Sequence, residues 1–574
     1  MAIGRPGCAG QTISPGHARL RGPSAERVYL VPITDILARN ARDYGGEVCL
    51  VEVNPGSEAR RNIGWREYEL IESSPAESYR REMTWAHFDD RADRVASYLL
   101  GKGLTKGSKV ALLLMNCLEW LPIYFGILRS GAVAVPLNYR YTADEIRYCL
   151  GLSESDALIF GPEFTTRVSE VRGLIPRVRT MLYAGADCPG FAESYDQEIP
   201  RCAPGKPEVS VGDGDEAAIY FSSGTTGFPK AILHDHRSLM FSCEVEREHH
   251  GQGRGDVFLC IPPLYHTGAK MHWFGSLLSG GKAVLLRGVR PEWILKAASD
   301  ERATIVWLLV PWAQDILDAI DDGSVRLSDY DLSDWRLMHI GAQPVPPSLV
   351  RRWLAAFPGH AYDTNYGLSE SIGPGCVHLG VANTHKVGAI GVPGHGWEAK
   401  VVDEAGAEVG AGAVGELIVK GDGVMRRYYN DPEATAASLK GGWLYTGDMA
   451  MVDADGFIHL VDRKKDVVIT GGENIYPVQI EDHLRGHAAV KDVAVIGMPD
   501  RRLGEIAAAI VELKAGMECG DSEIMAFCES MPRYKRPKRI IFDKVPRNPT
   551  GKIEKPALRR KYCGANLVER QMTD

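Results

Sequence analysis

The stretch Val110–Leu137, "VALLLMNCLEWLPIYFGILRSGAVAVPL", carries the pattern that decides the fold class. It opens with an apolar run, Val110–Met115, of the kind that forms a buried strand. Asn116 with Glu119 three residues later resembles a capping box, so we expect a helix to start here and to stop at Gly131. The run "AVAVPL" then predicts a second buried strand, which makes a strand–helix–strand unit with parallel strands.

Similar units recur along the chain. The strand-like runs "DVFLCIP", "AVLL", "TIVWLLV" and "RLMHI" are separated by helical stretches. From about residue 385 the pattern changes to short β runs with Gly-rich turns, and after Arg463 a compact piece combines the strand patterns "DVAVIGM" and "AAAIVEL" with two helical ones. We therefore predict an α/β protein: a large N-terminal domain of helix-covered, largely parallel sheets with a small β subdomain, followed by a small α+β C-terminal domain.

Composition narrows the functional classes. The 574 residues are too many for one hydrophobic core, and the net charge of −8 argues against a nucleic-acid-binding surface. No apolar run reaches the roughly 18 residues that a transmembrane helix needs. The twelve cysteines are scattered without a C-x-x-C pair, which favours reduced thiols in a cytoplasmic protein over a zinc site or a disulfide framework. Residues 1–27 are rich in Gly and Pro and fail as a signal peptide, so we expect a disordered tail.

The loop "SSGTTGFPK", Ser222–Lys230, combines glycines, hydroxyls and one lysine, which together suit a phosphate group. A Walker A loop would open directly into a helix. Here the lysine follows Pro229, and "AILHDH" after it predicts a short strand, so the Walker interpretation fails on spacing and on context.

Three later stretches could complete a nucleotide site. "NYGLSE" (Asn365–Glu370) offers an aromatic face, a tight turn, a hydroxyl and a carboxylate. "YTGDMA" contains Asp448, which could accept hydrogen bonds from ribose hydroxyls, and "RNPTGKIEK" places Lys552 on a Gly turn. Taken one at a time, these are more often an ordinary turn, a helix cap and a solvated surface lysine.

Their joint occurrence is specific. From about residue 30 to 562 the chain resembles the adenylate-forming superfamily of acyl-CoA synthetases, nonribosomal-peptide adenylation domains and luciferases. The resemblance is carried, in this order, by "YFSSGTTGFPKA", "PPLYHTGA", "MHIGAQPVPPSL", "TNYGLSES", "WLYTGDMA", "DRKKDVVITGGENIYPVQIE" and "YKRPKRIIFDKVPRNPTGKIEK". One departure is Ser369, where the family more often has Thr; the hydroxyl is retained.

The resemblance implies a two-step reaction, in which a carboxylate attacks the α-phosphorus of ATP, releases pyrophosphate and leaves an acyl-adenylate. It implies that Thr226 and Glu370 place Mg²⁺, and that Lys552 bridges the substrate carboxylate and the α-phosphate. Asp448 and Arg463 would engage the ribose and Tyr366 the adenine. The residues expected to hold the nucleotide are Ser222, Ser223, Gly224, Thr225, Thr226, Gly227, Lys230, Gly341, Ala342, Gln343, Asn365, Tyr366, Gly367, Ser369, Asp448 and Arg463.

In the second step, as the resemblance implies, the C-terminal domain swings about a hinge at Lys465 and opens a tunnel for a thiol. Gly471 and Gly472 would let pantetheine pass, and Arg536 with Lys538 could meet the phosphates of coenzyme A. The expected divisions are a tail at 1–27, an AMP-binding N-terminal domain at 28–462 with its β subdomain at about 385–462, and a mobile C-terminal domain at 463–574. The sequence allows a homodimer without requiring one.

The acceptor and the acid remain open at this point. No carrier-protein module follows, which favours free coenzyme A, but transfer to a carrier protein or an amine, or luciferase-like chemistry, uses the same motifs. Trp307, Trp312 and Trp273 suggest an apolar, partly aromatic wall for a fatty, aryl or alicyclic acid. The residues expected to line the acyl site are His266, Lys270, Met271, Trp307, Gly341 and Gly367. The run "EREHH" (Glu246–His250) could be drawn as a metal site, but its helical spacing near a Gly-rich exit favours an exposed surface.

Overall fold

The structure is a computed structural model that describes residues 20–21, 31–55, 78–222, 229–341, 345–470, 473–547 and 553–564. Predictions for Ser223–Gly227, Ala342, Gln343, Gly471, Gly472 and Lys552 lie outside the described residues. Of the tail expected at 1–27, only Leu20–Arg21 are described. They form strand β1, which pairs with β19 (Glu398–Val402).

The first large sheet has the strand order β21-β10-β9-β5-β4-β6-β7-β8. It contains the predicted unit: β4 (Lys109–Leu113) lies parallel to β5 (Val133–Pro136), and α3 (Trp120–Arg129) joins them. The other strands are β6 (Ala157–Phe160), β7 (Thr180–Tyr183), β8 (Glu193–Ser194), β9 (Glu216–Phe221), β10 (Ala231–Asp235) and β21 (Arg427–Tyr428).

The capping box expected at the start of α3 is wrong. The helix begins at Trp120, and its N-cap residue Glu119 makes no side-chain cap. The Asn116 carboxamide instead accepts from the Leu264 backbone N–H at 2.8 Å and donates to the Pro262 carbonyl at 3.0 Å. A contact nearly 150 residues away in sequence therefore uses the side chain that local spacing assigned to the helix.

The second large sheet has the order β15-β14-β13-β11-β12-β2-β3 and is parallel except at its β3 edge. Its strands are β2 (Val48–Val53), β3 (Arg80–Thr84), β11 (Val257–Cys260), β12 (Lys282–Leu286), β13 (Ile305–Leu309), β14 (Leu337–Gly341) and β15 (Ala361–Asp363). These bounds confirm the four strands predicted from apolar runs in this region.

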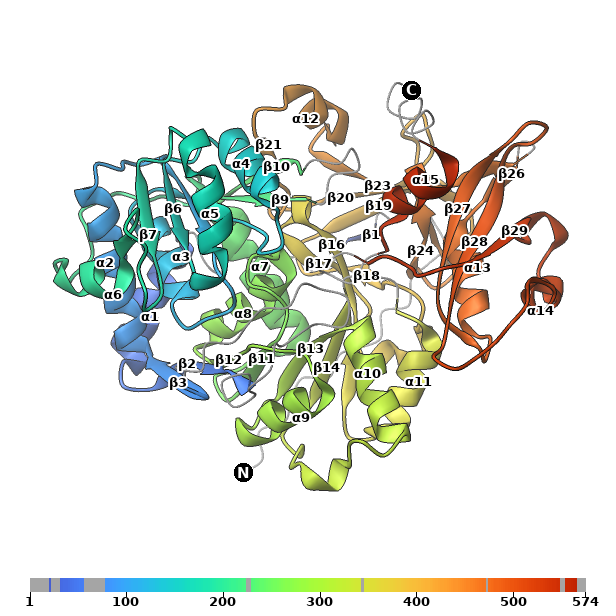
Figure 1. Cartoon of the computed structure of the whole chain (residues 1–574), viewed down its shortest axis with the longest axis horizontal. Coiled ribbons are helices and arrows are strands. Elements are labelled where there is room, and N and C mark those ends of the chain that lie inside the picture. Colours follow the sequence, from blue (N-terminus) through green and yellow to red (C-terminus); the bar gives the residue numbers. More distant parts are fainter. Residues whose placement is uncertain are drawn as a thin grey trace.

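Helices cover both large sheets, as the alternation predicted (Figure 1). One core joins the two sheets through α1 (Ile33–Tyr44), α2 (Trp85–Gly101), α3, α7 (His236–His250) and α8 (Thr267–Ser279). A second core lies under α9 (Pro291–Asp300), α10 (Val310–Asp321) and α11 (Pro347–Ala356), and a third under α4 (Ala143–Leu152) and α5 (Thr165–Val171). The short helix α6 spans Tyr195–Glu198.

Two smaller β regions follow. The strands β16 (Asn365–Leu368), β17 (Gly373–His378) and β18 (Val392–Pro393) form one small sheet. A six-stranded sheet combines β1 and β19 with β20 (Val414–Lys420), β22 (Leu439–Lys440), β23 (Trp443–Val452) and β24 (Ile458–Arg463). The helix α12 (Pro432–Ser438) packs beside β21 and β23. This region corresponds to the expected change of pattern near residue 385.

The C-terminal part forms a separate sheet, seen at the right of Figure 1. Its strands are β25 (Val468–Thr470), β26 (Glu473–Ile475), β27 (Val490–Asp500), β28 (Gly504–Leu513) and β29 (Arg539–Phe542), with α13 (Pro477–Arg485), α14 (Asp521–Phe527) and α15 (Lys555–Cys563) packed on it. Its two cores are its own. The predicted α/β fold class with a small α+β C-terminal domain is therefore confirmed. None of the helices in the described ranges has the length and hydrophobicity to span a bilayer.

Candidate active site

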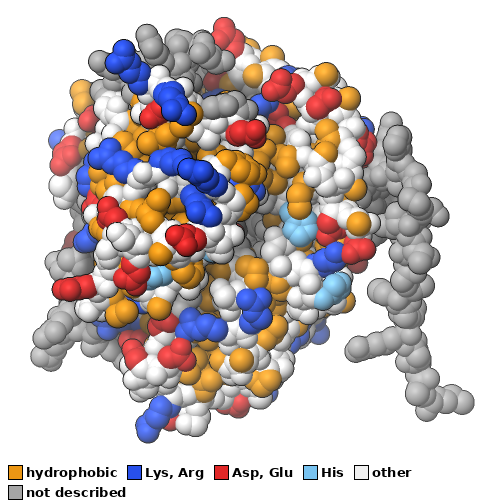
Figure 2. Space-filling model, turned by 90° about the vertical axis from the view of Figure 1, so that its right-hand side faces the viewer, with side chains coloured by type: hydrophobic (Ala, Val, Ile, Leu, Met, Phe, Trp, Pro, Cys, Tyr) orange, Lys and Arg blue, Asp and Glu red, His pale blue; other side chains and the backbone are white. Residues whose placement is uncertain are grey.

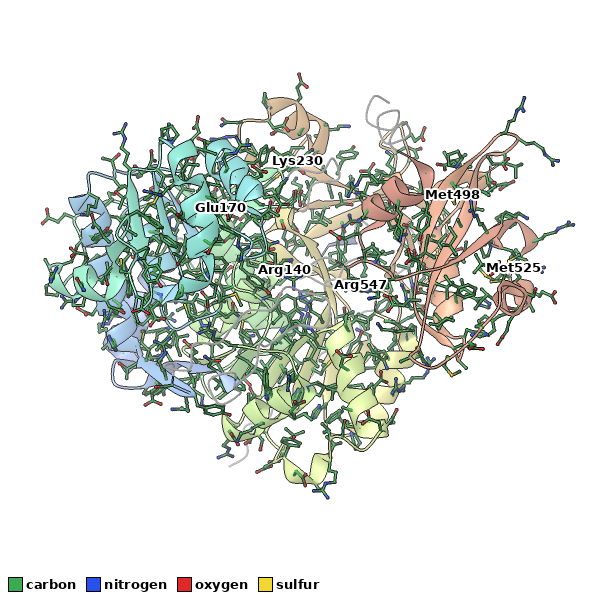
Figure 3. All side chains as sticks on the ribbon, viewed as in Figure 1. Arg140, Glu170, Lys230, Met498, Met525 and Arg547 are labelled. Carbon is green, nitrogen blue, oxygen red and sulfur yellow. The ribbon has the colours of Figure 1, made fainter. Side chains whose placement is uncertain are left out.

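A cleft of about 3120 Å³ runs between the large N-terminal part and the C-terminal sheet. Basic side chains enter it from three elements: Arg140 follows β5, Lys230 precedes β10, and Arg547 follows β29. Figure 3 labels these three residues around the centre of the molecule. Cations from both sides of one cleft suit an anionic ligand such as a polyphosphate.

The two ends of the expected phosphate loop are held by a β hairpin. Strands β9 and β10 pair antiparallel, and the Ser222 N–H donates to the Lys230 carbonyl at 3.1 Å. The intervening Ser223–Phe228 lie outside the described residues. The segment after Lys230 is the strand β10, as predicted, so the loop does not open into a helix as a Walker A loop would.

Glu370 and Lys230 both contact one tyrosine, Tyr428. The Tyr428 hydroxyl donates to Glu370 Oε1 at 2.8 Å, and Lys230 Nζ lies 4.8 Å from the centroid of the Tyr428 ring. Burial and the Glu370 carboxylate raise the pKa of Tyr428, so its hydroxyl stays a donor at neutral pH. Tyr428 thus orients the carboxylate at the cleft, and no part of the sequence analysis had singled it out.

Tyr366, Asp448 and Arg463 form a second group. The Tyr366 hydroxyl donates to Asp448 Oδ2 at 2.6 Å, and Arg463 Nε lies 3.6 Å from Asp448 Oδ1. Asp448 and Arg463 are directly opposite each other on the antiparallel strands β23 and β24. This register explains how residues fifteen apart in sequence come together, and it leaves a carboxylate and a guanidinium on the wall of the cleft.

The predicted hinge residue Lys465 lies in a 3₁₀ turn, Lys464–Asp466, between β24 and β25. This turn connects the six-stranded sheet to the C-terminal sheet. Burial, followed by the nearby Arg463 guanidinium, lowers the pKa of Lys465 to about 8. Two ion pairs flank the turn: Arg559 with Asp466 at 2.8 Å, and Lys555 with Glu481 at 2.9 Å.

Lys552 lies outside the described residues, but the residues that border segment 548–552 are described. Arg547 and Ile553 form an isolated antiparallel bridge, and both line the cleft. Arg547 is held by Asp492, with its Nε 2.6 Å from Asp492 Oδ2. The described residues on either side of segment 548–552 therefore both lie at the cleft.

Arg536 and Lys538 differ in what they contact. The Arg536 guanidinium donates to the backbone carbonyls of Met531 and Glu529, whereas Lys538 is exposed. Figure 2 shows Lys and Arg side chains gathered beside hydrophobic ones on the side of the molecule that carries the C-terminal sheet. Of the two expected phosphate contacts, Lys538 is the one whose side chain is offered to solvent.

The acyl side of the expected site contains His266 and Trp307. His266 is the N-cap of α8, where its Nδ1 accepts from the Gly268 N–H at 3.2 Å. Trp307 is buried on β13 and packs its six-membered ring onto Gly268: a Cβ there would lie 2.3 Å from Trp307 Cη2. Lys270 and Met271 belong to α8, but their side chains are not described.

Only part of the expected tryptophan wall lies on the cleft. Trp307 and Trp312 line it, but Trp273 does not. Trp273 is buried in the central core, with its ring centroid 5.7 Å from that of Phe125 and 6.0 Å from that of Phe88. The residue types alone did not reveal which of the three tryptophan rings face the cleft.

The expectation that "EREHH" lies on the surface holds for Glu248, which is exposed, but is wrong for Glu246 and His250, which are buried. His250 Nδ1 lies 3.1 Å from Glu246 Oε2, and its Nε2 lies 3.2 Å from Asp363 Oδ2. Burial opposes a charged imidazole, but the bonds to Asp363 and Glu246 raise the pKa of His250 to about 9. His250, His339 and Asp363 have ligand atoms within 4.8 Å of one another, and His378 Nδ1 also lies 3.5 Å from Asp363 Oδ2.

This network lies across the strands beside the acyl site. Trp307, His339 and Asp363 are register partners on β13, β14 and β15, so their side chains share one face of the sheet. Two positions after His339 lies Gly341 on β14, and two positions after Asp363 lies Asn365 on β16. The Asn365 Nδ2 donates to Glu246 Oε1 at 3.2 Å. The residues of this row come from three separate runs of sequence, "VWLL", "MHIG" and "YDTNYG". Only the pairing of strands β13, β14 and β15 shows that they lie side by side.

Comparison with known proteins identifies the family. The protein-family model described as "AMP-binding enzyme" matches residues 66–429, and the family model described as "AMP-binding enzyme C-terminal domain" matches residues 479–552. Feruloyl-CoA synthase of Amycolatopsis sp is 34% identical over 485 residues, which are 84% of this chain and 94% of that protein. The long-chain-fatty-acid–CoA ligase FadD13 of Mycobacterium tuberculosis is 32% identical over 516 residues, 88% of this chain and 99% of that protein.

Solved structures agree with this. The anthranilate CoA ligase AuaEII in complex with anthranoyl-AMP superposes with a TM-score of 0.82 at 27% identity, over 93% of this chain and 98% of that one. The amide bond synthetase McbA from Marinactinospora thermotolerans superposes with a TM-score of 0.77 at 26% identity, over 92% of this chain and 100% of that one. The chain therefore belongs to the AMP-binding enzyme family, and it is an adenylate-forming carboxylic acid–CoA ligase with the large and small domains of that family.

Proposed function

We propose that the enzyme activates a hydrophobic fatty, aryl or alicyclic carboxylic acid in two steps. The acid attacks the α-phosphorus of ATP, an acyl-adenylate forms and pyrophosphate leaves; the thiol of coenzyme A then attacks the acyl carbon and AMP leaves. The observation that carries the proposal is the single cleft, because it gathers Lys230, Glu370, Tyr366, Asp448 and Arg463 from four distant motifs.

The nucleotide roles follow from the chemistry of these side chains. In this structure the Asp448 carboxylate accepts a hydrogen bond from the Tyr366 hydroxyl; when the nucleotide binds, it accepts hydrogen bonds from the ribose hydroxyls instead. Arg463 balances the charge of Asp448. The Tyr366 ring lies against the adenine. Ser222, Lys230 and the loop between them bind the β- and γ-phosphates, where Lys230 acts as a point charge.

Glu370 fits a magnesium ion, since its carboxylate offers hard oxygen ligands on the cleft and Tyr428 orients it. With Thr226 it would hold Mg²⁺, which neutralises phosphate charge when bound. The substrate carboxylate is already an anion at neutral pH, so the chain needs no general base for the first step. It needs cations where negative charge accumulates, and Lys552 supplies one at the α-phosphate.

For the second step we propose that residues 463–574 rotate as a unit about Lys465 relative to residues 28–462. The 3₁₀ turn Lys464–Asp466 is the short connection on which such a rotation depends. Gly471 and Gly472 would then border the path of the thiol, and Lys538 would meet a phosphate of coenzyme A. Mass spectrometry of the products tests the proposal: ATP, acid and coenzyme A should yield AMP, pyrophosphate and an acyl thioester.

One observation keeps a second acceptor in view. The similarity to an amide bond synthetase covers 92% of this chain, so an amine acceptor is the alternative. If the reaction releases acyl-AMP in the presence of coenzyme A, and forms an amide when an amine is added, the thioester step of the proposal is wrong.

A further inference from the structure

The C-terminal part presents one of its two proposed functional segments to the cleft. The residues on both borders of segment 548–552, which contains Lys552, line the cleft. Thr470 and Glu473, which border Gly471–Gly472, do not line it. Under the proposed function, Lys552 acts in the first step and the two glycines border the thiol path in the second. The structure therefore has the orientation that the first step requires.

A carboxylate on the other side of the proposed pivot contacts the C-terminal part in this orientation. Asp462 lies near the end of β24, before the turn Lys464–Asp466. Its Oδ2 accepts a hydrogen bond from the Val478 N–H at 3.0 Å, and Val478 is in the first turn of α13. The first N–H groups of a helix have no partner within it, and the N-cap residue of α13, Tyr476, makes no side-chain cap. The helix α13 is therefore capped from across the pivot.

The chemistry of this contact suits a carboxylate. Asp462 is 6% exposed, and its Oδ1 accepts a hydrogen bond from the Arg463 N–H at 2.7 Å. Both oxygens thus accept from backbone N–H groups, which an amide with its single acceptor oxygen cannot do. Burial raises the pKa of Asp462 to about 6, although the Lys555 ammonium opposes this rise, so the side chain is mostly ionised at neutral pH.

The charges that face Asp462 from the C-terminal part largely offset each other. Lys555 on α15 attracts the Asp462 carboxylate, and Glu481 on α13 repels it. These two side chains pair with each other, with Lys555 Nζ 2.9 Å from Glu481 Oε1, so the pair moves with the C-terminal part. Asp466, at the end of the turn, pairs with Arg559 at 2.8 Å. The direct hydrogen bond from α13 is therefore the contact that distinguishes this orientation.

A rotation about Lys465 would break this hydrogen bond. Asp462 and Val478 lie on opposite sides of the pivot, so the rotation moves the N–H away from the carboxylate. Water then replaces the lost partner, and the carboxylate regains the hydration that burial had removed. Such a bond holds an orientation without locking it.

We propose that Asp462 is a positioning residue for adenylation: its hydrogen bond to the N-terminus of α13 holds the C-terminal part in the orientation that brings the Lys552 segment to the cleft, and this bond breaks before the thioester step. The inference rests on the proposed function. It assigns a role to the strand end before the pivot, where the sequence motif had indicated only the hinge Lys465.

Rates of the two half-reactions test the inference. The probe is whichever of benzoate, cinnamate, cyclohexanecarboxylate and dodecanoate the unaltered enzyme adenylates fastest. Adenylation is followed as pyrophosphate release in a single turnover without coenzyme A, and thioester formation is followed from supplied acyl-adenylate. Asp462→Ala should slow adenylation by about 10-fold, because a buried hydrogen bond to a charged group is lost, and should leave thioester formation unchanged or faster.

Two further variants sharpen the test. Asp462→Asn keeps one acceptor oxygen and the side-chain volume, so adenylation should fall by only about threefold. Asp235→Asn is the matched control, because Asp235 is also buried and caps α7 through the Ser238 N–H at 2.9 Å, but both partners lie in the N-terminal part. This control should leave the ratio of the two half-reaction rates unchanged. A cooperative melting transition reports folding, and if Asp462→Ala does not fold, Asp462→Asn decides.

The outcomes separate the two proposals. An unchanged adenylation rate in the Asp462 variants, an equal loss in both half-reactions, or a loss confined to thioester formation overturns the inference and leaves the ligase assignment intact. A change in the ratio that Asp235→Asn shares also overturns it. If none of the four acids releases pyrophosphate, the proposed function fails first and the inference with it.

Discussion

The two ends of the cleft are built differently. At the proposed nucleotide end, Tyr366 on β16 and Glu370 on the 3₁₀ turn after it lie four residues apart, and Asp448 faces Arg463 across two adjacent antiparallel strands. Near the proposed acyl end, Trp307, His339 and Asn365 come from three strands, and Glu246 near the end of α7 accepts a hydrogen bond from Asn365. The nucleotide end is thus made of short local motifs, and the acyl end is made by packing.

This difference has a consequence for substitution. A local motif keeps its geometry through its own hydrogen bonds, such as that from Tyr366 to Asp448. The proposed acyl end depends on contacts between distant elements, such as Trp307 on Gly268, so a small change far along the chain can reshape it. A substitution at the proposed nucleotide end should therefore alter mainly the KM for ATP, and one at the proposed acyl end mainly the KM for the acid.

The largest effect is expected for Lys552→Ala. Adenylation should fall by about 10²–10³-fold, because in the proposed mechanism Lys552 stabilises charge that develops at the α-phosphate. Thioester formation from supplied acyl-adenylate should change little. Measuring both half-reactions checks this, with Lys544→Ala, an exposed lysine on the same segment, as the control. Equal losses in both half-reactions would assign Lys552 to folding or to coenzyme A.

Gly268→Ala should break the acyl end selectively. The new methyl group would overlap the Trp307 ring, with only 2.3 Å to Cη2, so the indole must move. A displacement of this size costs up to about 10²-fold in kcat/KM for the acid, while the KM for ATP stays the same. Gly255→Ala, where an added Cβ meets nothing within 4 Å, is the matched control. An equal rise in both KM values would contradict the separation of the two ends.

Lys465→Pro should slow the second step by roughly tenfold and spare the first. Proline locks φ near −65° and so restricts the turn about which we propose that the C-terminal part rotates between the steps. Single-turnover adenylation and thioester formation are measured separately. Lys465→Ala serves as the control, because it removes the side chain but leaves φ free. If both variants behave alike, the side chain matters and the pivot lies elsewhere.

Thermal stability should fall as the pH rises through 9. Burial lowers the pKa of His250, but the contacts with Asp363 and Glu246 raise this pKa in the folded state to about 9, above the ordinary value of 6.5. Stabilisation from this group is therefore complete below about pH 6.5 and is lost through pH 9. Melting temperatures across this range check it. His250→Gln, which does not titrate, should flatten the decline; an unchanged decline would refute the assignment.

The smallest effect is expected for Lys538→Ala. An exposed charge–phosphate contact contributes about 1 kcal/mol or less, so the KM for coenzyme A should rise by about fivefold at most, and less at high salt. Arg536→Ala makes an instructive comparison, because its guanidinium holds the Met531 and Glu529 carbonyls and its loss should lower the melting temperature. A rise in the KM for ATP with Lys538→Ala would argue against a coenzyme A contact.

The sequence by itself determined the fold class and about half of the strands of the two large sheets, among them β4, β5, β13 and β14. The strands in "TIVWLLV" and "RLMHI" are buried on both faces. A strand buried on both faces is an almost continuous run of apolar residues, which can be recognised in the sequence alone. The nucleotide motifs were visible for a similar reason. Their residues lie close together in sequence, and a loop or turn needs particular residue types whatever surrounds it.

Only the tertiary structure decided which side chains meet. Asn116 fitted a helix cap by spacing, but it bonds to the segment around Leu264 instead. Glu246 and His250 fitted an exposed helix end, yet they are buried because Asp363 on β15 supplies a partner for the imidazole. Trp273 and Trp307 are equally aromatic, and packing alone sends one into the core and the other to the cleft. Local patterns depend on neighbours in sequence, whereas the lining of the acyl site depends on strand register and helix packing, which no short stretch of the chain contains.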